Sequence, residues 1–293
     1  MLCYSFLSYD NLLNMKNQSW DIVLSKNSSS SFKFDNLSNS VDLLILFFKR
    51  DFTTTYKQTI LGPLWYIIQP ALSTILYIFV FHKIAGITTS NIPVVPFYLS
   101  GTILWGFIAD TVPRISNSLR DNQYLFSKVY FPRIILPLSI VLNGLMKIFI
   151  QLLFFIPIYF YFWINGEITL SLFVVYSPLL LLWSTAFSLG LGLTFAAITS
   201  KYRDLIFSIG FIMQFLLYVS PILYPLSAVS PRLHDYFSIN PLTSLFETMR
   251  VLIFSEGSVD LIKLSISLSI TTLILAAGLT MFDKTQKNFI DTV

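Results

Sequence analysis

Long apolar runs separated by short polar segments dominate the sequence from about residue 64 onward. An α-helix needs about 20 mostly apolar residues to cross the ~30 Å hydrocarbon core of a bilayer. The runs are continuous rather than alternating, which is typical of membrane helices and not of a β-barrel. We therefore predict six spans, at about residues 64–84, 97–113, 134–163, 168–198, 204–224 and 259–282.

Composition supports an all-α integral membrane protein. Of 293 residues, 55% are hydrophobic and 12% charged, which is about half the charged share of a soluble domain. Residues 1–41 are polar and rich in Ser and Asn, so we predict a flexible leader there without a cleavable signal peptide. The membrane domain would then occupy residues 42–293. The single Cys3 excludes an internal disulfide.

The placement of the cations predicts the orientation. If the N-terminus is cytoplasmic, fourteen of the nineteen Lys and Arg lie in cytoplasmic segments, as the positive-inside rule requires. Six spans also bring both termini to the same side. The net charge of +4 is explained by this placement, and we expect no nucleic-acid partner.

Residues 42–61 are too charged to cross a membrane. Their apolar first half and cationic second half favour a helix that lies in the interface, with Lys49, Arg50 and Lys57 near lipid headgroups. Alternatively, these cations only anchor the inner end of the first span.

Polar and aromatic residues recur at helical spacing on three predicted spans. Lipid does not solvate such side chains, so these faces should meet protein or water. They would either pack against other helices or line a conduit, where rings and amides suit a sugar chain. The candidates are Tyr66, Gln69, Ser73 and Tyr77 in the first span, Trp105 in the second, and Gln214 and Tyr218 in the fifth.

Two further stripes follow helical spacing. The third span carries Asn143, Lys147 and Gln151, and the lysine near mid-membrane must face a water-filled space or pair with an acid, for example across a subunit interface. The fourth span carries small residues that predict close helix packing: Ser184, Ser188, Gly192, Ala196 and Ser200.

The connection over residues 225–258 is too apolar for a simple loop and too rich in proline to cross the membrane. We predict a short helix over 242–254 that dips into the outer leaflet, with Glu247 and Arg250 paired at i and i+3.

Several kinds of chemistry lack their motifs. There is no G-x-x-x-x-G-K-[ST] phosphate-binding loop and no G-x-S-x-G elbow, and His82 and His234 stand without ligand-spaced partners, so we expect no metal site. Two hypotheses remain. The chain is either a transport subunit without an ATPase of its own, or a membrane-embedded transferase or polymerase that acts on lipid-linked glycans.

Five stretches, in order, carry a resemblance to a known family: "RDFTTTYKQTILGPLWYIIQP" (50–70), "LFSKVYFPRIILPLS" (125–139), "LGLGLTFAAITSKYRDL" (189–205), "SPILYPLS" (220–227) and "INPLTSLFETMR" (239–250). Together they resemble the polysaccharide-export permeases of the ABC transporter superfamily, which export O-antigen, capsular polysaccharide or teichoic acid. The resemblance extends from about residue 42 to the C-terminus.

The resemblance implies a homodimer of six-span subunits in the cytoplasmic membrane of a bacterium, joined by two P-loop ATPase subunits that bind ATP and Mg. The cargo would be a lipid-linked polysaccharide, with O-antigen favoured, and this chain would itself hold no cofactor. It also implies a cytoplasmic coupling helix within about 114–133 and extracytoplasmic gate helices over 225–254 that include Glu247 and Arg250. The implied contacts of the ATPase are Arg120, Asp121, Lys128, Arg133, Tyr202, Arg203 and Asp204. No family role is carried onto Lys147.

Overall fold

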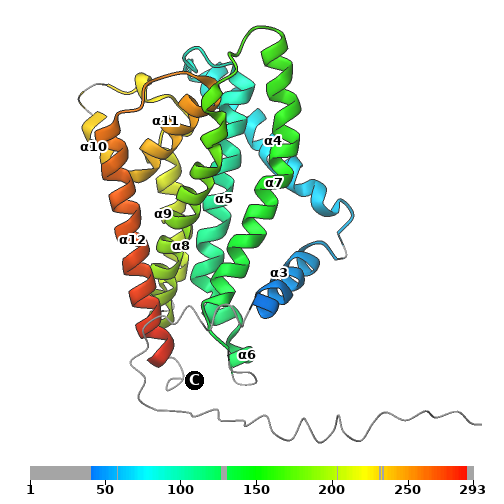
Figure 1. Cartoon of the computed structure of the whole chain (residues 1–293), viewed down its shortest axis with the longest axis vertical. Coiled ribbons are helices and arrows are strands. Elements are labelled where there is room, and N and C mark those ends of the chain that lie inside the picture. The colour runs from blue at the N-terminus through cyan, green and yellow to red at the C-terminus, as the bar shows by residue number, and fades with distance from the viewer. Residues whose placement is uncertain are drawn as a thin grey trace, which may run out of the picture. The chain divides into compact units, whose positions relative to one another are not determined.

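The computed structural model describes residues 41–57, 59–126, 131–202, 204–230, 232 and 234–288, which form a bundle of helices without strands (Figure 1). Five helical stretches are long and apolar enough to cross a membrane: Gly62–Ile84, Val94–Asp121, Ile135–Ile164, Leu172–Lys201 and Leu261–Gln286. The predicted all-α membrane fold is therefore confirmed. The predicted leader, residues 1–41, lies outside the described ranges except for its last residue.

The bundle begins with two helical stretches at its periphery. Helix α3 (Val41–Tyr56) ends before the first span, which consists of η2 (Gly62–Leu64), α4 (Trp65–Tyr77) and η3 (Ile78–Ile84). The stretch η3 is wound as a π-helix, in which the amide of Ala85 donates to the carbonyl of Val80 over 2.9 Å. Pro70 lies inside α4, so its missing N–H removes one hydrogen bond of that helix.

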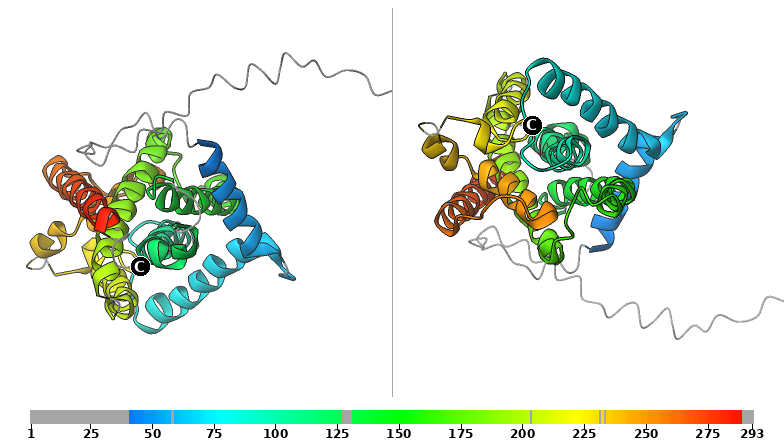
Figure 2. Two further views of the ribbon diagram at one scale, coloured as in Figure 1. Left: turned by 90° about the horizontal axis from the view of Figure 1, so that it is seen from below. Right: turned by 90° about the horizontal axis from the view of Figure 1, so that it is seen from above.

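Helix α5 (Val94–Asp121) lies at the centre of the bundle, where the views along the bundle show other helices around it (Figure 2). Within its apolar window 72% of the residues are buried, against 17% for the first and last spans. Helix α7 (Ile135–Ile164) packs beside it.

Helix α5 also extends beyond its predicted end at residue 113. Its last turns, residues 114–121, continue the span because Ile115 and Leu119 are buried one turn apart and the hydroxyl of Thr199 donates to the carbonyl of Ser116. Residues 114–121 of the implied coupling-helix region, 114–133, therefore belong to α5. Only the four-residue α6 (Gln123–Phe126) follows before residues 127–130, which are outside the described ranges.

The second half of the chain packs through small residues. Helix α8 (Ser177–Lys201), preceded by η4 (Leu172–Tyr176), lies against α5 and against α12 (Leu261–Asn288). A Cβ atom on Gly278 would lie 2.4 Å from the carbonyl oxygen of Gly190, and one on Gly192 would lie 2.7 Å from Ile115. The predicted small-residue contact is confirmed, since glycine allows this close approach of two backbones.

The segment predicted as the fifth span forms α9 (Leu205–Val219). Its 15 residues extend over about 22 Å, which is shorter than the ~30 Å hydrocarbon core. The chain then returns through the short η5 (Leu226–Ala228), α10 (His234–Ile239) and α11 (Pro241–Phe254). The predicted helix over 242–254 is confirmed as α11, where the Asn240 side chain accepts from the amide of Leu242 as an N-cap.

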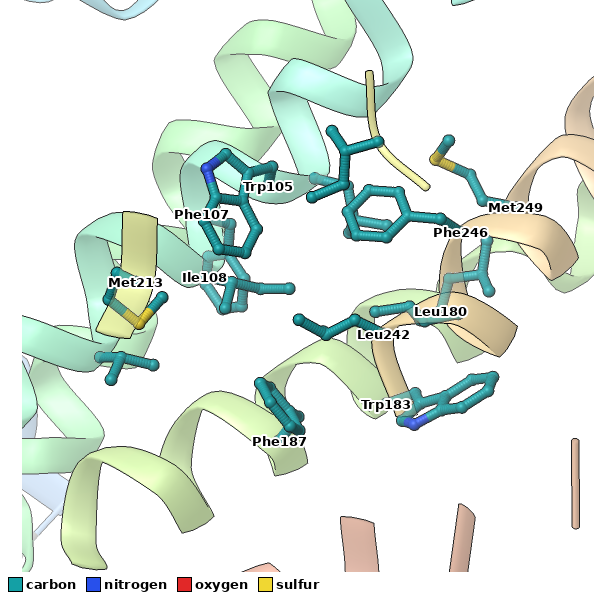
Figure 3. Close-up of a cluster of buried hydrophobic side chains, with 14 of the residues drawn as sticks. Trp105, Phe107, Ile108, Leu180, Trp183, Phe187, Met213, Leu242, Phe246 and Met249 are labelled. Carbon is teal, nitrogen blue, oxygen red and sulfur yellow. The ribbon is translucent and has the colours of Figure 1, made fainter. Parts of the chain in front are cut away.

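The main core lies where α5, α8, α9 and α11 meet (Figure 3). In a membrane, lipid is as apolar as leucine, so van der Waals packing and hydrogen bonds between helices stabilise this core. One such bond joins the indole of Trp183 to the hydroxyl of Thr271 over 3.0 Å. The large core side chains are Trp105, Phe107, Trp183, Phe187, Met213, Phe246 and Met249.

Candidate functional site

An open surface lies on α4 and α9, the two helices that carry most of the predicted channel residues. Gln69, Gln214 and Tyr218 are exposed on these helices. The phenol of Tyr77 on α4 interacts electrostatically with that of Tyr218 on α9, so these two residues lie near each other. Tyr66 and Ser73 are half-buried on α4.

This surface is aromatic and amide-bearing along the whole of α9. Phe207, Phe211 and Phe215 are exposed on α9 together with Gln214 and Tyr218. Helix α4 is held against α5 by a 3.2 Å contact between the hydroxyls of Thr74 and Thr102. The surface therefore presents rings and amides beside the most buried helix of the bundle.

Trp105 does not share this surface. Its side chain is only 8% exposed and lies in the core between α5, α9 and α11 (Figure 3). The indole therefore packs against other helices and offers a passing ligand little surface.

The polar stripe of α7 contacts α3 and α4 through its two amide side chains. The Asn143 amide donates to the carbonyl of Phe48 in α3 over 3.5 Å, and the Gln151 amide donates to the carbonyl of Tyr66 in α4 over 3.0 Å. Both amides are buried, so these bonds satisfy polar groups that lipid would leave unpaired. The stripe thus has a packing role at its two ends.

Lys147, in the middle of this stripe, pairs with Asp110 of α5. Its Nζ atom lies 3.6 Å from the Asp110 Oδ2 and 5.6 Å from the ring centroid of Tyr66. The acid predicted as a possible partner thus exists within the same chain. Sequence reasoning missed Asp110, although its i, i+4 spacing to Arg114, also 3.6 Å away, was a usable signal.

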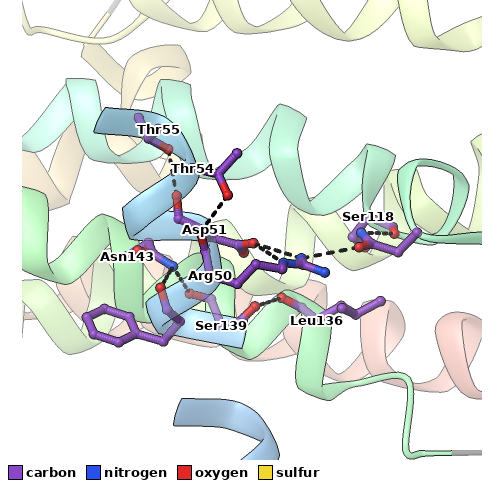
Figure 4. Close-up of polar contacts among 10 residues, drawn as sticks. Arg50, Asp51, Thr54, Thr55, Ser118, Leu136, Ser139 and Asn143 are labelled. Carbon is purple, nitrogen blue, oxygen red and sulfur yellow. Dashed lines mark hydrogen bonds and ion pairs between the residues drawn. The ribbon is translucent and has the colours of Figure 1, made fainter. Parts of the chain in front are cut away.

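Helix α3 is fixed to the bundle by apolar contacts and by polar contacts, and Figure 4 shows the polar ones. Phe47 is buried against Phe131, Ile135 and Leu136. The Arg50 guanidinium pairs with Asp51 over 2.7 Å and donates to the Asn122 side chain over 3.2 Å.

Both other predicted interface cations are exposed: Lys49 on α3, and Lys57 just after its last residue. Exposed Ile45 and Leu46 lie on α3 as well. Helix α3 thus combines a face against protein with exposed apolar and cationic side chains, as an interfacial helix requires.

Four of the predicted ATPase contacts are exposed at the end of the bundle where α5 and α8 end. Arg120 and Asp121 pair with each other over 3.3 Å at the last turn of α5. Tyr202 and Asp204 follow α8 and are also exposed.

Arg133 differs from these four because it is buried. Its guanidinium donates to the carbonyl of Gln286 in α12 over 2.6 Å and lies 4.7 Å above the ring centroid of Phe126. The other two predicted contacts, Lys128 and Arg203, lie outside the described residues.

At the opposite end, Arg250 of α11 joins several segments. It pairs with Glu247 over 2.5 Å, as its spacing predicted, and donates to the carbonyls of Pro221 and Tyr224. Its guanidinium also lies 4.3 Å from the ring centroid of Phe97 in α5. Burial lowers the pKa of Arg250, and the Glu247 carboxylate opposes that shift. The pair therefore fixes α11 to the chain that follows α9.

A cavity of about 350 Å³ lies among α5, α7, η4, α8 and α11. Its walls are almost wholly apolar, with Ile148, Phe155, Leu180 and Met249 among the lining residues. Such walls cannot satisfy sugar hydroxyls. The surface of α4 and α9 is therefore the better candidate for contact with a glycan.

Comparison with known proteins finds relatives that are all named as transport proteins. The profile of a family described as ABC-2 type transporter matches residues 42–254. An O-antigen export system permease protein, RfbA, of Klebsiella pneumoniae is 28% identical over 87% of this chain and 96% of its own length. Its counterpart from Myxococcus xanthus is 25% identical over 86% of this chain and 95% of its own length. The polysialic acid transport protein KpsM of Escherichia coli is 25% identical over 80% of this chain and 90% of its own length.

Proposed function

We propose that this chain, which belongs to the ABC-2 type transporter family, is the membrane-spanning subunit of a polysaccharide exporter. The observation that carries the proposal is the match along most of the chain to permeases named for O-antigen export. The multi-pass helical fold agrees with such a role. O-antigen is the favoured cargo, and it would travel linked to a lipid.

The energy for export would come from a partner. Membership of this family implies pairing with an ABC ATPase subunit, and the sequence of this chain has no phosphate-binding loop of its own. We expect two ATPase subunits that bind ATP and Mg. The exposed Arg120, Asp121, Tyr202 and Asp204 offer charged and polar contacts for them at one end of the bundle.

The path for the cargo would form between two copies of this chain. The open surface of α4 and α9 supports this proposal because its rings can stack on sugar C–H faces and its amides can bind hydroxyls. Loose contacts of this kind allow a long chain to slide. Gln69, Gln214 and Tyr218 are exposed and so most available for it, Tyr77 is half-buried beside them, and Trp105 would support the path from behind.

The positive-inside rule supports an orientation with both termini in the cytoplasm of a bacterium and the chain in its cytoplasmic membrane. In this orientation the ATPases would dock beside α6, and α11 would lie at the outer end, where Glu247 and Arg250 could form part of a gate. Helix α3 would then lie in the inner interface.

A gentle affinity purification of the full chain from native membranes tests the subunit assignment. We expect a P-loop ATPase to co-purify at a ratio of one to one, with a total mass that corresponds to two copies of each chain. ATP hydrolysis by this complex would support the proposal. A chain that purifies without any ATPase would instead favour the membrane-enzyme alternative.

A further inference from the structure

Lys147, Arg114 and Asp110 form a charged cluster between α5 and α7 to which the proposed export path gives no role. The Asp110 Oδ2 lies 3.6 Å from the Lys147 Nζ and 3.6 Å from the Arg114 Nη1. Two cations thus share one carboxylate, and the cluster keeps a surplus positive charge. Because an uncompensated charge is costly in a membrane span, the surplus needs a counter-ion.

Both cations keep hydrogen-bond donors that the described part of the chain does not use. A charge-assisted N–H···O bond spans ~2.7–2.9 Å, so pairs at 3.6 Å are ion pairs without a full hydrogen bond. Among the described residues, neither cation donates a hydrogen bond to any other group. An ammonium has three donors and a guanidinium has five. The cluster can therefore bind an anion with several acceptor oxygens.

The cluster is also accessible. The side chains of Asp110 and Arg114 are each 37% exposed, and that of Lys147 is 13% exposed. The bonds from Asn143 to α3 and from Gln151 to α4 occupy the same stripe of α7, one turn on either side of Lys147. The cluster thus lies next to the interfacial helix and the start of the first span.

The cluster lies between the middle of the two helices and the end of the bundle where α5 ends and α7 begins. Arg114 lies seven residues before the end of α5, or ~10 Å along the helix, and Lys147 lies twelve residues after the start of α7, or ~18 Å. Helix α5 has 28 residues, about 42 Å, and so exceeds the ~30 Å hydrocarbon core. Its last turns therefore extend toward the headgroups, and the long cationic side chains can reach that layer.

We propose that Lys147 and Arg114 bind the phosphate group of a lipid in the leaflet beside α3, with the carrier lipid of the exported polysaccharide as the occupant. Asp110 holds the two cations in place and competes with the phosphate, which keeps binding reversible. The identity of the occupant rests on the proposed function, whereas the phosphate chemistry does not. A bulk phospholipid offers the same chemistry and is separated from the carrier by the test.

The test measures lipid binding to the full-length chain in detergent by native mass spectrometry. The probes are a sugar-free polyprenyl diphosphate, phosphatidylglycerol and inorganic pyrophosphate. Lys147→Gln and Arg114→Gln should each weaken binding of the polyprenyl diphosphate about tenfold, the effect of losing one charged hydrogen-bond partner. Asp110→Asn should tighten binding, because it removes the competing carboxylate. Lys83→Gln, which changes an exposed cation of η3, should leave binding unchanged.

A binding site predicts that Lys147→Gln weakens lipid binding and Asp110→Asn strengthens it, whereas a purely structural ion pair predicts no change of lipid binding in either variant. If Lys147→Gln and Asp110→Asn both lower the thermal stability and leave lipid binding unchanged, the proposal is overturned. Equal affinity for phosphatidylglycerol would support the phosphate site and overturn the carrier as its occupant. If the wild-type chain binds none of the probes, the phosphate site is overturned. The proposed export function is not affected by that result, since the binding assay requires neither the ATPase nor export.

Discussion

Arg250 gives the most quantitative prediction. Its side chain is 4% exposed and makes an ion pair with Glu247, bonds to the carbonyls of Pro221 and Tyr224, and a contact with the ring of Phe97. Removing one partner of a buried ion pair costs ~3–5 kcal/mol. Because Glu247 retains 28% exposure and can be partly hydrated, we expect Arg250→Met to cost about 3 kcal/mol, at the lower end of that range.

The assay is thermal unfolding of the full chain in mild detergent. A loss of 3 kcal/mol corresponds to a Tm lower by roughly 6–12 °C, using the ~2–4 °C per kcal/mol of larger chains. Lys263→Gln, which changes a half-buried cation of α12, serves as the matched control and should shift Tm by less than about 2 °C. An Arg250→Met chain that unfolds within 2 °C of the wild type would refute the role of this residue in fixing α11 to the chain that follows α9.

Three further predictions concern packing and coupling. Gly278→Ala should lower Tm and protein yield because its Cβ would meet a backbone carbonyl of α8, whereas Gly210→Ala, which meets nothing within 4 Å, should be tolerated; equal stability of both would contradict the close helix contact. Trp105→Ala should lower protein abundance and export by the same fraction, measured by immunoblot and surface glycan, and a larger loss of export would restore a lining role. Replacing Arg120 and Asp121 together should uncouple ATP hydrolysis from export with insertion intact, and normal surface glycan would argue against their docking role.

The sequence was sufficient for the features that depend on local pattern. The apolar runs predicted the membrane helices, and the small-residue stripe predicted the close contact of α8. The i, i+3 spacing of Glu247 and Arg250 predicted their ion pair. Each of these follows from residues on one helix, where spacing alone decides which side chains share a face.

The features that were missed depend on contacts between segments far apart in the chain. The continuation of α5 past residue 113 was not predicted, because Ile115 and Leu119 are surrounded by polar residues and only their packing shows that the helix continues. The partner of Lys147 was not found because Asp110 is 37 residues away on another helix. The burial of Trp105 could not be predicted either, since hydrophobic spacing cannot separate a buried face from an open one when both are aromatic.

The location of the glycan after removal of this chain tests the central claim most directly. Cells depleted of the chain, and cells complemented with it, would be compared for lipid-linked polysaccharide in the cytoplasmic leaflet and for glycan on the surface. For an export subunit, we expect full-length glycan to accumulate inside the depleted cells while surface glycan disappears. Complementation should remove the accumulated glycan and restore the surface glycan. Absence of the glycan from both locations would contradict export and identify a defect in synthesis.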